Sequence, residues 1–368
     1  MTNHLHDDEQ LLRARVALAS EIERVSGVLS SRVVEAFLNV PRHAFVPAFY
    51  REEGGVHRPW RAGDGWLREV YADQVLVTEV EGVHAEDAGS EGVRGVATSS
   101  STLPSLMADM LDALDVRPGD RVLEIGTGTG YNAALLCHLA GAQHVTTIDR
   151  TEHLVATART RLSEVGFEAA VVQADGADGY PGNGPYDRII ATCGVRSLPR
   201  TWLDQCVPGG LVVAPLGGAV ARLTKLPDGR AVGRFLHRPA AFMPLRDGKE
   251  PGWEVPEPTS ADSRTTESGA HVLDDPGFVF WADLHLAPTV VRDGHALRDT
   301  ADGSTAHAQG RTVALGGPRD LWRTVEAAHQ VWLDRNRPRR EWFTVEAGPE
   351  GQFAGYTAPD GSTTRWSL

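Results

Sequence analysis

The stretch 121-RVLEIGTGTGYNAALL-136 decides the fold that we expect for this chain. Its apolar start, 122–125, predicts a short buried strand, and residues 131–139 predict a helix. Three glycines separate these two elements: Gly126, Gly128 and Gly130. Glycines at such a junction let the main chain turn tightly and let a ligand lie against it. A tight turn without a ligand is the alternative, but three alternating glycines favour a binding site.

The spacing of these glycines distinguishes two classes of ligand. Dinucleotide-binding proteins carry G-x-G-x-x-G, which here would require a glycine where the chain has Tyr131. The observed spacing is G-x-G-x-G, and an acidic residue, Glu124, precedes it. A nucleoside without a pyrophosphate fits this pattern better. We therefore predict S-adenosyl-L-methionine (SAM) as the cofactor and S-adenosyl-L-homocysteine as its product.

Acidic residues also end the next two predicted strands. The strand 144-HVTTID-149 ends at Asp149, where a carboxylate can accept hydrogen bonds from both ribose hydroxyls. The alternative is that Asp149 caps the helix that follows it. The third strand ends in Ala174-Asp175-Gly176, which suits contact with an adenine amino group. Three such strand ends in consecutive βα units support one nucleoside site.

Strand and helix signals alternate over residues 98–217, which predicts an α/β fold with a doubly wound, mainly parallel, Rossmann-like sheet. Outside this region we expect helices over 10–50, a strand at 75–77, a strand in 278-FVFWADLHLA-287 and an amphipathic helix over 319–333. The predicted organisation has four parts: a helical segment with a substrate loop (1–97), the SAM-binding Rossmann-like core (98–245), a linker (246–269) and a smaller α+β extension (270–368).

Composition limits the partners and the compartment. The chain has 36 basic and 49 acidic residues, a formal net charge of −13, which argues against nucleic acids and anionic membranes as partners. The N-terminus lacks a signal-peptide pattern and no apolar run is long enough to span a bilayer, so we expect a cytoplasmic protein. Three scattered cysteines form no disulfide framework, and the 14 histidines show no ligand spacing, so we expect no metal site.

Several further stretches resemble the protein-L-isoaspartate O-methyltransferases over roughly residues 20–245. The stretches that carry the resemblance are 39-NVPRHAFVP-47, 71-YADQVLV-77, 122-VLEIGTGTGYNAALL-136, 173-QADGADGYPGNGPYDRIIAT-192, 208-PGGLVVAPLG-217 and 242-FMPL-245. The VPRHAFVP segment is the specific one, because SAM-dependent enzymes in general lack it. The resemblance implies methylation of an aspartyl or isoaspartyl carboxylate in a peptide or protein.

Repair enzymes of this family carry a serine beside the accepting carboxylate, in a segment that corresponds here to 98-TSSSTLPSLMADML-111. Alignment on Pro104 and Met110 places Thr102 at that serine, and a shift of one residue would place Ser101 there. The alternative is that these hydroxyls cap the helix that begins near Pro104. The resemblance thus implies a catalytic hydroxyl at Thr102 or Ser101.

An insertion over 79–97 and the extension after 245 depart from a minimal repair enzyme. Both features resemble lanthipeptide- and graspetide-associated methyltransferases, which esterify an aspartate of a cyclised precursor peptide so that an aspartimide forms. This ribosomal-peptide maturation role is our preferred prediction. Housekeeping isoaspartate repair, methylation of a small molecule and a non-catalytic SAM-binding scaffold are the alternatives.

The complete set of predicted site residues follows from these arguments. The expected substrate contacts, besides the catalytic hydroxyls, are Tyr71, Asp73, Ser100 and Thr192. The expected cofactor contacts are Glu124, Gly126, Thr127, Gly128, Gly130, Asp149, Arg150, Asp175 and Gly176.

Overall fold

The computed structural model describes residues 2–63, 65–246 and 262–368. The chain divides into two compact units, which are described separately. The first comprises Met1–Cys193 and Thr201–Val213, and the second Gly194–Arg200 and Ala214–Leu368. Most of the predicted linker, 247–261, lies outside the described residues. Within the described ranges, no helix is long and apolar enough to cross a membrane.

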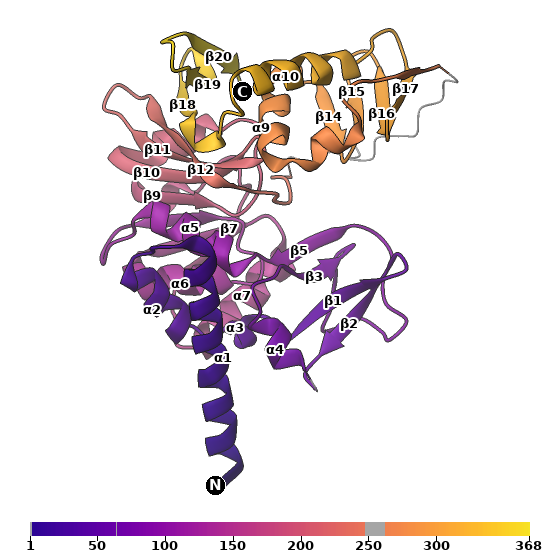
Figure 1. The fold of residues 1–368 in the computed structure, drawn as a ribbon. Helices are drawn as coiled ribbons and strands as arrows, with labels where there is room; N and C mark the ends of the chain where they lie inside the picture. Colours follow the sequence, from indigo (N-terminus) through magenta and orange to yellow (C-terminus); the bar gives the residue numbers. More distant parts are fainter. Residues whose placement is uncertain (1, 64, 247–261) are drawn as a thin grey trace. The chain divides into compact units, whose positions relative to one another are not determined.

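A parallel sheet forms the centre of the first unit (Figure 1). Its strands, in spatial order, are β10 (Cys206–Leu216, to Val213 in this unit), β9 (Tyr186–Ala191), β6 (Val122–Ile125), β7 (Val145–Asp149) and β8 (Ala170–Gln173). Because β6 pairs with both β7 and β9, the strand order reverses beside it, and such reversals are where α/β sheets bind ligands. All four residues of β6 are buried, as expected for a strand covered on both faces. The predicted doubly wound sheet is confirmed.

Two groups of helices pack around this sheet. The first group contains α1 (Thr2–Ser26), α2 (Ser31–Asn39), α5 (Pro104–Leu114) and α6 (Tyr131–Ala140), which pack on one another. The helix α7 (Glu152–Glu164) packs on β7, β8 and the short helix α3 (Arg42–Phe45). The remaining short helices near this unit are α4 (Trp66–Val70), α8 (Arg200–Gln205), η1 (Ala142–His144) and η2 (Pro181–Asn183).

A second, antiparallel sheet precedes the parallel one in the chain. It contains β2 (Val56–Arg61), β1 (Ala48–Glu53), β3 (Leu76–Val80) and β4 (Val83–His84), and β5 (Ala97–Ser101) also pairs with β3. The sequence predicted only a strand at 75–77. The sequence did not predict the hairpin β1–β2, because apolar and polar residues do not alternate regularly in either strand. Its turn lies at Gly54 and Gly55, which have the positive φ angles that glycine permits.

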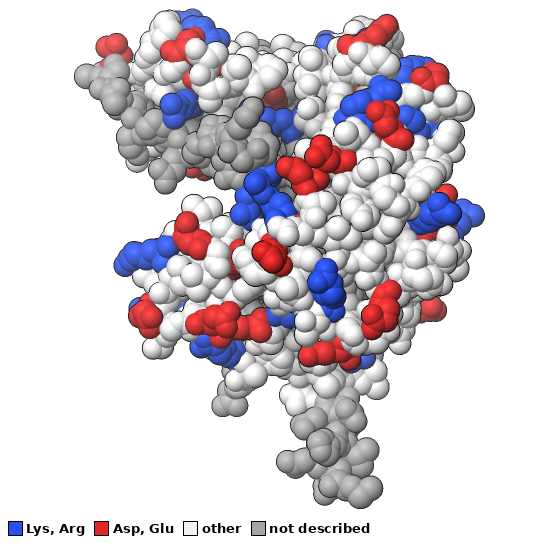
Figure 2. Space-filling model, turned by 180° about the vertical axis from the view of Figure 1, so that it is seen from behind, with Lys and Arg blue, Asp and Glu red and all other residues white. Residues whose placement is uncertain are grey.

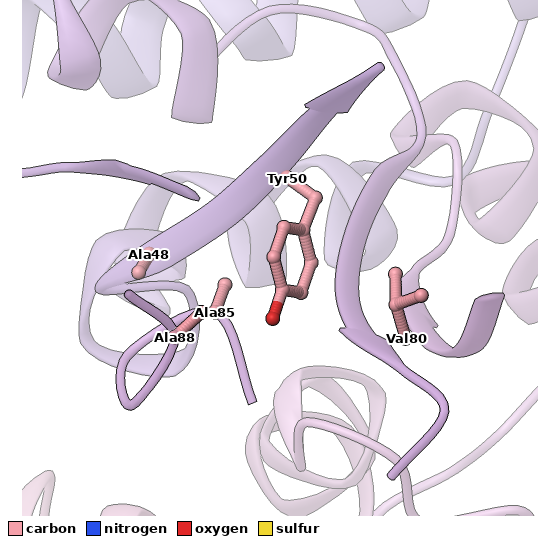
Figure 3. Close-up of a cluster of buried hydrophobic side chains, with 5 residues drawn as sticks. All are labelled: Ala48, Tyr50, Val80, Ala85 and Ala88. Carbon is pink, nitrogen blue, oxygen red and sulfur yellow. The ribbon is translucent and has the colours of Figure 1, made fainter. Parts of the chain in front are cut away.

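A small apolar cluster stabilises this sheet. Figure 3 shows the Tyr50 ring between Val80 of β3 and two alanines that follow β4, Ala85 and Ala88. Ala48 of β1 completes the cluster, and all five residues are at most 5% exposed. The 79–97 insertion is therefore part of a packed sheet.

In the second unit, residues 214–246 and 262–368 contain two antiparallel sheets and the α-helices α9 (Pro276–His285) and α10 (Trp322–Asp334). One sheet has the order β11 (Ala219–Lys225), β12 (Ala231–Pro239), β18 (Thr344–Gly348), β19 (Gly351–Thr357) and β20 (Thr363–Ser367). The other has the order β13 (Ser263–Thr265), β17 (Thr312–Gly316), β16 (Thr305–Gln309), β15 (Ala296–Asp299) and β14 (Val290–Asp293). Short 3-10 turns lie at η3 (Ala270–Asp274) and η4 (Arg340–Trp342). On the face drawn in Figure 2, acidic and basic side chains are interspersed.

The stretch 278–287 corrects one sequence prediction, because it belongs to a helix rather than a strand. Helix α9 (Pro276–His285) begins where the Asp275 side chain accepts hydrogen bonds from the backbone of Gly277 and Phe278, with Pro276 in the first turn. It packs beside α10 (Trp322–Asp334; Figure 1), the predicted amphipathic helix. An apolar run buried on several sides has no helical periodicity, so its sequence resembles a buried strand.

Candidate active site

The glycine loop begins where β6 ends. Gly126 has φ +100°, and a Cβ there would lie 2.6 Å from the hydroxyl of Thr192, which donates a hydrogen bond to the Gly126 carbonyl. Thr192 follows β9, the neighbour of β6 in the sheet. Glycine is required at 126 because the end of the adjacent strand packs directly against it.

Gly128 lies at the middle of the loop and is held by Asp149. The Gly128 amide donates to one carboxylate oxygen of Asp149 at 3.1 Å, and the Thr151 amide donates to the other at 3.1 Å. The second bond does not make Asp149 the cap of α7, because the N-cap residue is Thr151 and no side chain caps this helix. A Cβ at Gly128 would meet no protein atom closer than the Ser99 hydroxyl at 3.7 Å, so the loop surface is open there. An open glycine loop beside a half-buried carboxylate with free lone pairs fits a SAM nucleoside.

Glu124 lies in β6, the strand that precedes the glycine loop, and binds side chains that support the loop. Its carboxylate is fully buried and accepts hydrogen bonds from Asn132 at 2.7 Å and Thr147 at 2.6 Å. Burial raises the pKa of Glu124 to about 7, although both hydrogen bonds lower it. The Thr127 and Thr147 hydroxyls are 2.7 Å apart and extend this network to the loop. Both oxygens of Glu124 therefore bind protein groups, and its contact with the cofactor stays a prediction.

The other predicted cofactor residues lie at neighbouring strand ends. The exposed Asp175 side chain accepts from the Ala177 amide at 2.9 Å, and the carbonyl of buried Gly176 accepts from Trp202 at 2.7 Å. Arg150 is exposed and follows Asp149. Gly130 begins α6 with φ +85°. The parallel topology brings these residues to one edge of the sheet, and their contacts with SAM remain predicted.

The hydroxyls that the resemblance singled out lie at the end of β5, with Ser101 as its last residue and Thr102 directly after it. Ser99 and Ser101 are buried, whereas Ser100 and Thr102 are partly exposed. The neighbouring carbonyl of Ser100 lies 3.8 Å from the position of a Cβ on Gly128. The hydroxyl segment therefore lies directly beside the middle glycine of the cofactor loop, within the same unit.

Arg42 joins this segment to the loop before β3. Its guanidinium is fully buried and donates to the Ser101 hydroxyl at 3.2 Å and to the Thr102 carbonyl at 3.3 Å. It also donates to the carbonyls of Val70, Ala72 and Gln74 at 3.0–3.1 Å. Burial lowers the pKa of Arg42 to about 10, so it stays cationic at neutral pH. The sequence analysis did not predict this role, although Arg42 is the arginine of the VPRHAFVP segment.

Tyr71 and Asp73 lie in the loop that Arg42 holds. The Tyr71 hydroxyl is 2.8 Å from Nδ1 of His43, and burial raises the pKa of Tyr71. One oxygen of Asp73 accepts from the Ser105 amide at 2.8 Å, in the first turn of α5. The residue at the N-cap of α5, Leu103, has no side-chain cap bond, so Asp73 takes the capping role that we considered for the hydroxyls. The structure brings Tyr71, Asp73, Ser101 and Thr102 together around Arg42.

Fold and site together define a SAM-dependent methyltransferase, and the predicted cofactor residues lie at the carboxyl ends of β6, β7 and β8. The family model described as protein-L-isoaspartate(D-aspartate) O-methyltransferase matches residues 14–250. The chain therefore belongs to the protein-L-isoaspartate O-methyltransferase family of SAM-dependent carboxyl methyltransferases.

Individual relatives agree with this assignment. The protein-L-isoaspartate O-methyltransferase of Methanopyrus kandleri is 33% identical over 258 residues, 68% of this chain and 98% of the relative. That of Methanosarcina mazei is 33% identical over 208 residues, 56% of this chain and 72% of the relative. A solved protein-L-isoaspartate O-methyltransferase structure, 23% identical with a TM-score of 0.55, covers 93% of this chain and is itself covered to 99%. A fold of this family can thus include a long C-terminal extension.

Proposed function

We propose that this chain transfers the methyl group of SAM to the free carboxylate of an isoaspartyl residue in peptides and proteins. Family membership and the names of its relatives support this substrate. The observation that carries the proposal is the position of β5, whose hydroxyl segment lies beside Gly128 and is held by Arg42.

The reaction needs alignment more than acid–base chemistry. A carboxylate with a pKa near 4 is already an anionic nucleophile at neutral pH, and SAM supplies a methyl group activated by the sulfonium. The partly exposed Thr102 hydroxyl donates a hydrogen bond to the substrate carboxylate and orients it. Arg42 keeps Thr102 in place through its carbonyl. Cys193 takes no part, because burial raises the pKa of its thiol to about 12.

The ester formed in this step explains how repair follows. The backbone amide nitrogen after the modified residue attacks the ester carbonyl, methanol leaves, and a five-membered imide closes. Hydrolysis of the imide then returns either an aspartyl or an isoaspartyl linkage. This sequence needs no further catalytic group from the chain.

A matched pair of linear peptides tests the proposal. One peptide contains aspartate and the other isoaspartate at the same position, and S-adenosyl-L-homocysteine release is measured with each. We expect turnover of the isoaspartyl peptide alone. Equal rates with both peptides, or none with either, would contradict an isoaspartate-specific enzyme.

Peptide maturation is the second candidate. The observation that favours it is the insertion over 79–97, which adds β4 and a packed segment to the sheet that carries β5. The C-terminal extension does not distinguish peptide maturation from repair, because a solved isoaspartate methyltransferase covers 93% of this chain. The substrate that tests maturation is a conformationally constrained peptide with an ordinary aspartate. Turnover of this peptide, together with rejection of linear isoaspartyl peptides, would favour peptide maturation.

The domain assignment also stays a proposal, with 98–245 as the methyltransferase core and 270–368 as a peptide-recruiting extension. Removal of 270–368 would strip β18 from β12, with which it pairs at Ala231–Arg234, so truncation is a poor test. A better test keeps the full chain and lengthens an isoaspartyl peptide on both sides. If the extension recruits peptide, KM should fall with length while kcat stays constant. A KM independent of length would argue against recruitment.

A further inference from the structure

Three side chains that are distant in the sequence meet beside the hydroxyl strand. They are Glu79 of β3, His84 of β4 and His153 of α7, and one ligand atom of each lies within 4.8 Å of the others. Nε2 of His153 is 2.5 Å and Nε2 of His84 is 3.6 Å from the same carboxylate oxygen of Glu79. Two imidazole nitrogens thus converge on one carboxylate oxygen.

The local structure holds Glu79 and His84 on one side of the sheet. They are directly opposed in the antiparallel pair β3–β4, so their side chains point the same way. The turn between the strands, at Glu81 and Gly82, has two positive φ angles, as tight hairpins require. The Tyr50 hydroxyl donates to the Val83 carbonyl at 3.1 Å and anchors the short strand β4.

The carboxylate of Glu79 is oriented and the imidazole of His84 has an unused nitrogen. Glu79 is 1% exposed, and the Thr98 hydroxyl donates to its other oxygen at 2.6 Å. Nε2 of His84 is buried and makes no hydrogen bond with any residue in the described ranges. A buried imidazole nitrogen without a partner is costly, and such an atom requires an explanation. A bound cation would supply the missing partner.

We propose that Glu79, His84 and His153 bind a divalent transition-metal ion, with Zn²⁺ as the ion that suits them best. Two imidazoles and one carboxylate are a ligand set that zinc uses when a fourth position is left to water. Tetrahedral bonds of about 2.0–2.1 Å place ligand atoms about 3.3 Å apart. The two distances to the Glu79 oxygen, 2.5 and 3.6 Å, lie on either side of this value.

The ion would connect two parts of the active site. His153 lies in the first turn of α7, directly after Asp149, whereas Glu79 pairs with Ser99 of the hydroxyl strand. Binding therefore ties the strand that positions the acceptor to the helix that follows the predicted ribose contact. The ion has a structural role and takes no part in methyl transfer itself. It is independent of which carboxylate the enzyme methylates.

Zinc binding to the chelator-treated full chain tests the proposal. Isothermal titration with ZnCl₂ should give one ion per chain, and a hundredfold excess over Kd should raise Tm by about 5–10 °C. Mg²⁺ should do neither, because it prefers oxygen ligands. Glu79→Gln, His84→Ala and His153→Ala should each lose this binding.

Matched variants separate the site from adventitious binding. His138→Ala changes an exposed histidine on α6. His4→Ala combined with His6→Ala removes two closely spaced histidines near the N-terminus. Both should keep one ion per chain. His153 is 45% exposed, so His153→Ala should fold even if His84→Ala does not. Absence of zinc binding, or binding that survives His153→Ala and Glu79→Gln, would overturn the proposal.

Discussion

The two sides of the active site are built from residues at very different distances along the chain. On the cofactor side, Glu124, Gly128 and Asp149 belong to one βαβ unit, in which Gly128 donates to Asp149 and Glu124 accepts from a neighbour on the same strand as Asp149. On the substrate side, Arg42 reaches Thr102 across 60 residues, and Asp73 caps a helix 32 residues later. The comparison shows that a nucleoside site can be local in sequence, whereas the acceptor site depends on long-range pairing.

Each side is also built around one fully buried ionisable side chain. Glu124 accepts hydrogen bonds within the parallel sheet, and Arg42 donates them to several segments of the substrate side. Burial shifts both pKa values toward the neutral form. The following predictions test whether the two sides are separable.

The largest effect should come from Arg42→Met. This change leaves several buried carbonyls without donors and should cost roughly 3–5 kcal/mol of unfolding free energy, as for a broken buried charged network. Arg42→Lys should recover little, because an ammonium cannot donate in the same planar fork. Urea denaturation measures the loss, and Arg117→Ala, at a side chain that is 67% exposed, is the matched control. A loss below about 1 kcal/mol for Arg42→Met would show that the substrate side does not depend on this hub.

The second effect is the pH dependence of the free energy of unfolding that Glu124, on the cofactor side, causes. Glu124 titrates near pH 7 in the folded chain and near 4.5 in the unfolded chain, so the folded state holds its proton more tightly. The contribution of Glu124 to the free energy of unfolding is therefore fully present below pH 4.5. As pH rises to about 7, this contribution falls by roughly 3 kcal/mol.

Glu124→Gln removes this titration and keeps the shape of the side chain. The difference in unfolding free energy between the variant and the wild type should therefore move in favour of the variant as pH rises from 4.5 to 8. Denaturation curves at several pH values measure it. A difference independent of pH would mean that Glu124 is ionised over the whole range.

The third effect is on SAM affinity. Asp149→Ala should weaken binding by roughly 1.5–3 kcal/mol, about 10- to 150-fold in Kd, because charge-assisted hydrogen bonds are lost. Titration with S-adenosyl-L-homocysteine measures it, with Glu152→Ala, an exposed acid in the next helix, as the control. Since the two sides are separate, KM for peptide should change little. Unchanged affinity would remove the predicted ribose contact.

The smallest effect should separate two adjacent hydroxyls. Thr102→Ala should lower kcat about tenfold, whereas Thr102→Ser should keep most activity because the hydroxyl remains. The Ser101 hydroxyl accepts from Arg42, so Ser101→Ala should lower stability by about 1 kcal/mol and leave kcat nearly unchanged. Steady-state kinetics and denaturation of the three variants decide this. The reverse pattern would place the contacting hydroxyl at Ser101.

The sequence alone determined the parallel sheet, the glycine loop, the SAM cofactor and the family. The sheet, the loop and the cofactor follow from short-range patterns: an apolar run, glycines at alternate positions, and acids at strand ends. The family follows from the resemblance that the VPRHAFVP segment carries. Such patterns are visible without the fold because each ligand group lies within one or two βα units. The strand suggested at 278–287 is wrong, because most of this stretch belongs to helix α9 (Pro276–His285).

Only the tertiary structure decided which hydroxyl stays available, what Arg42 binds and that Glu79, His84 and His153 meet. Their contacts join segments that are far apart in the chain, and the strand that brings His84 opposite Glu79, β4, has only two residues. Pairing between such strands depends on burial against the rest of the sheet rather than on local preference. For this reason the sequence identifies the cofactor and the family, whereas the contacts that Arg42 and Glu79 make become visible only in the three-dimensional packing.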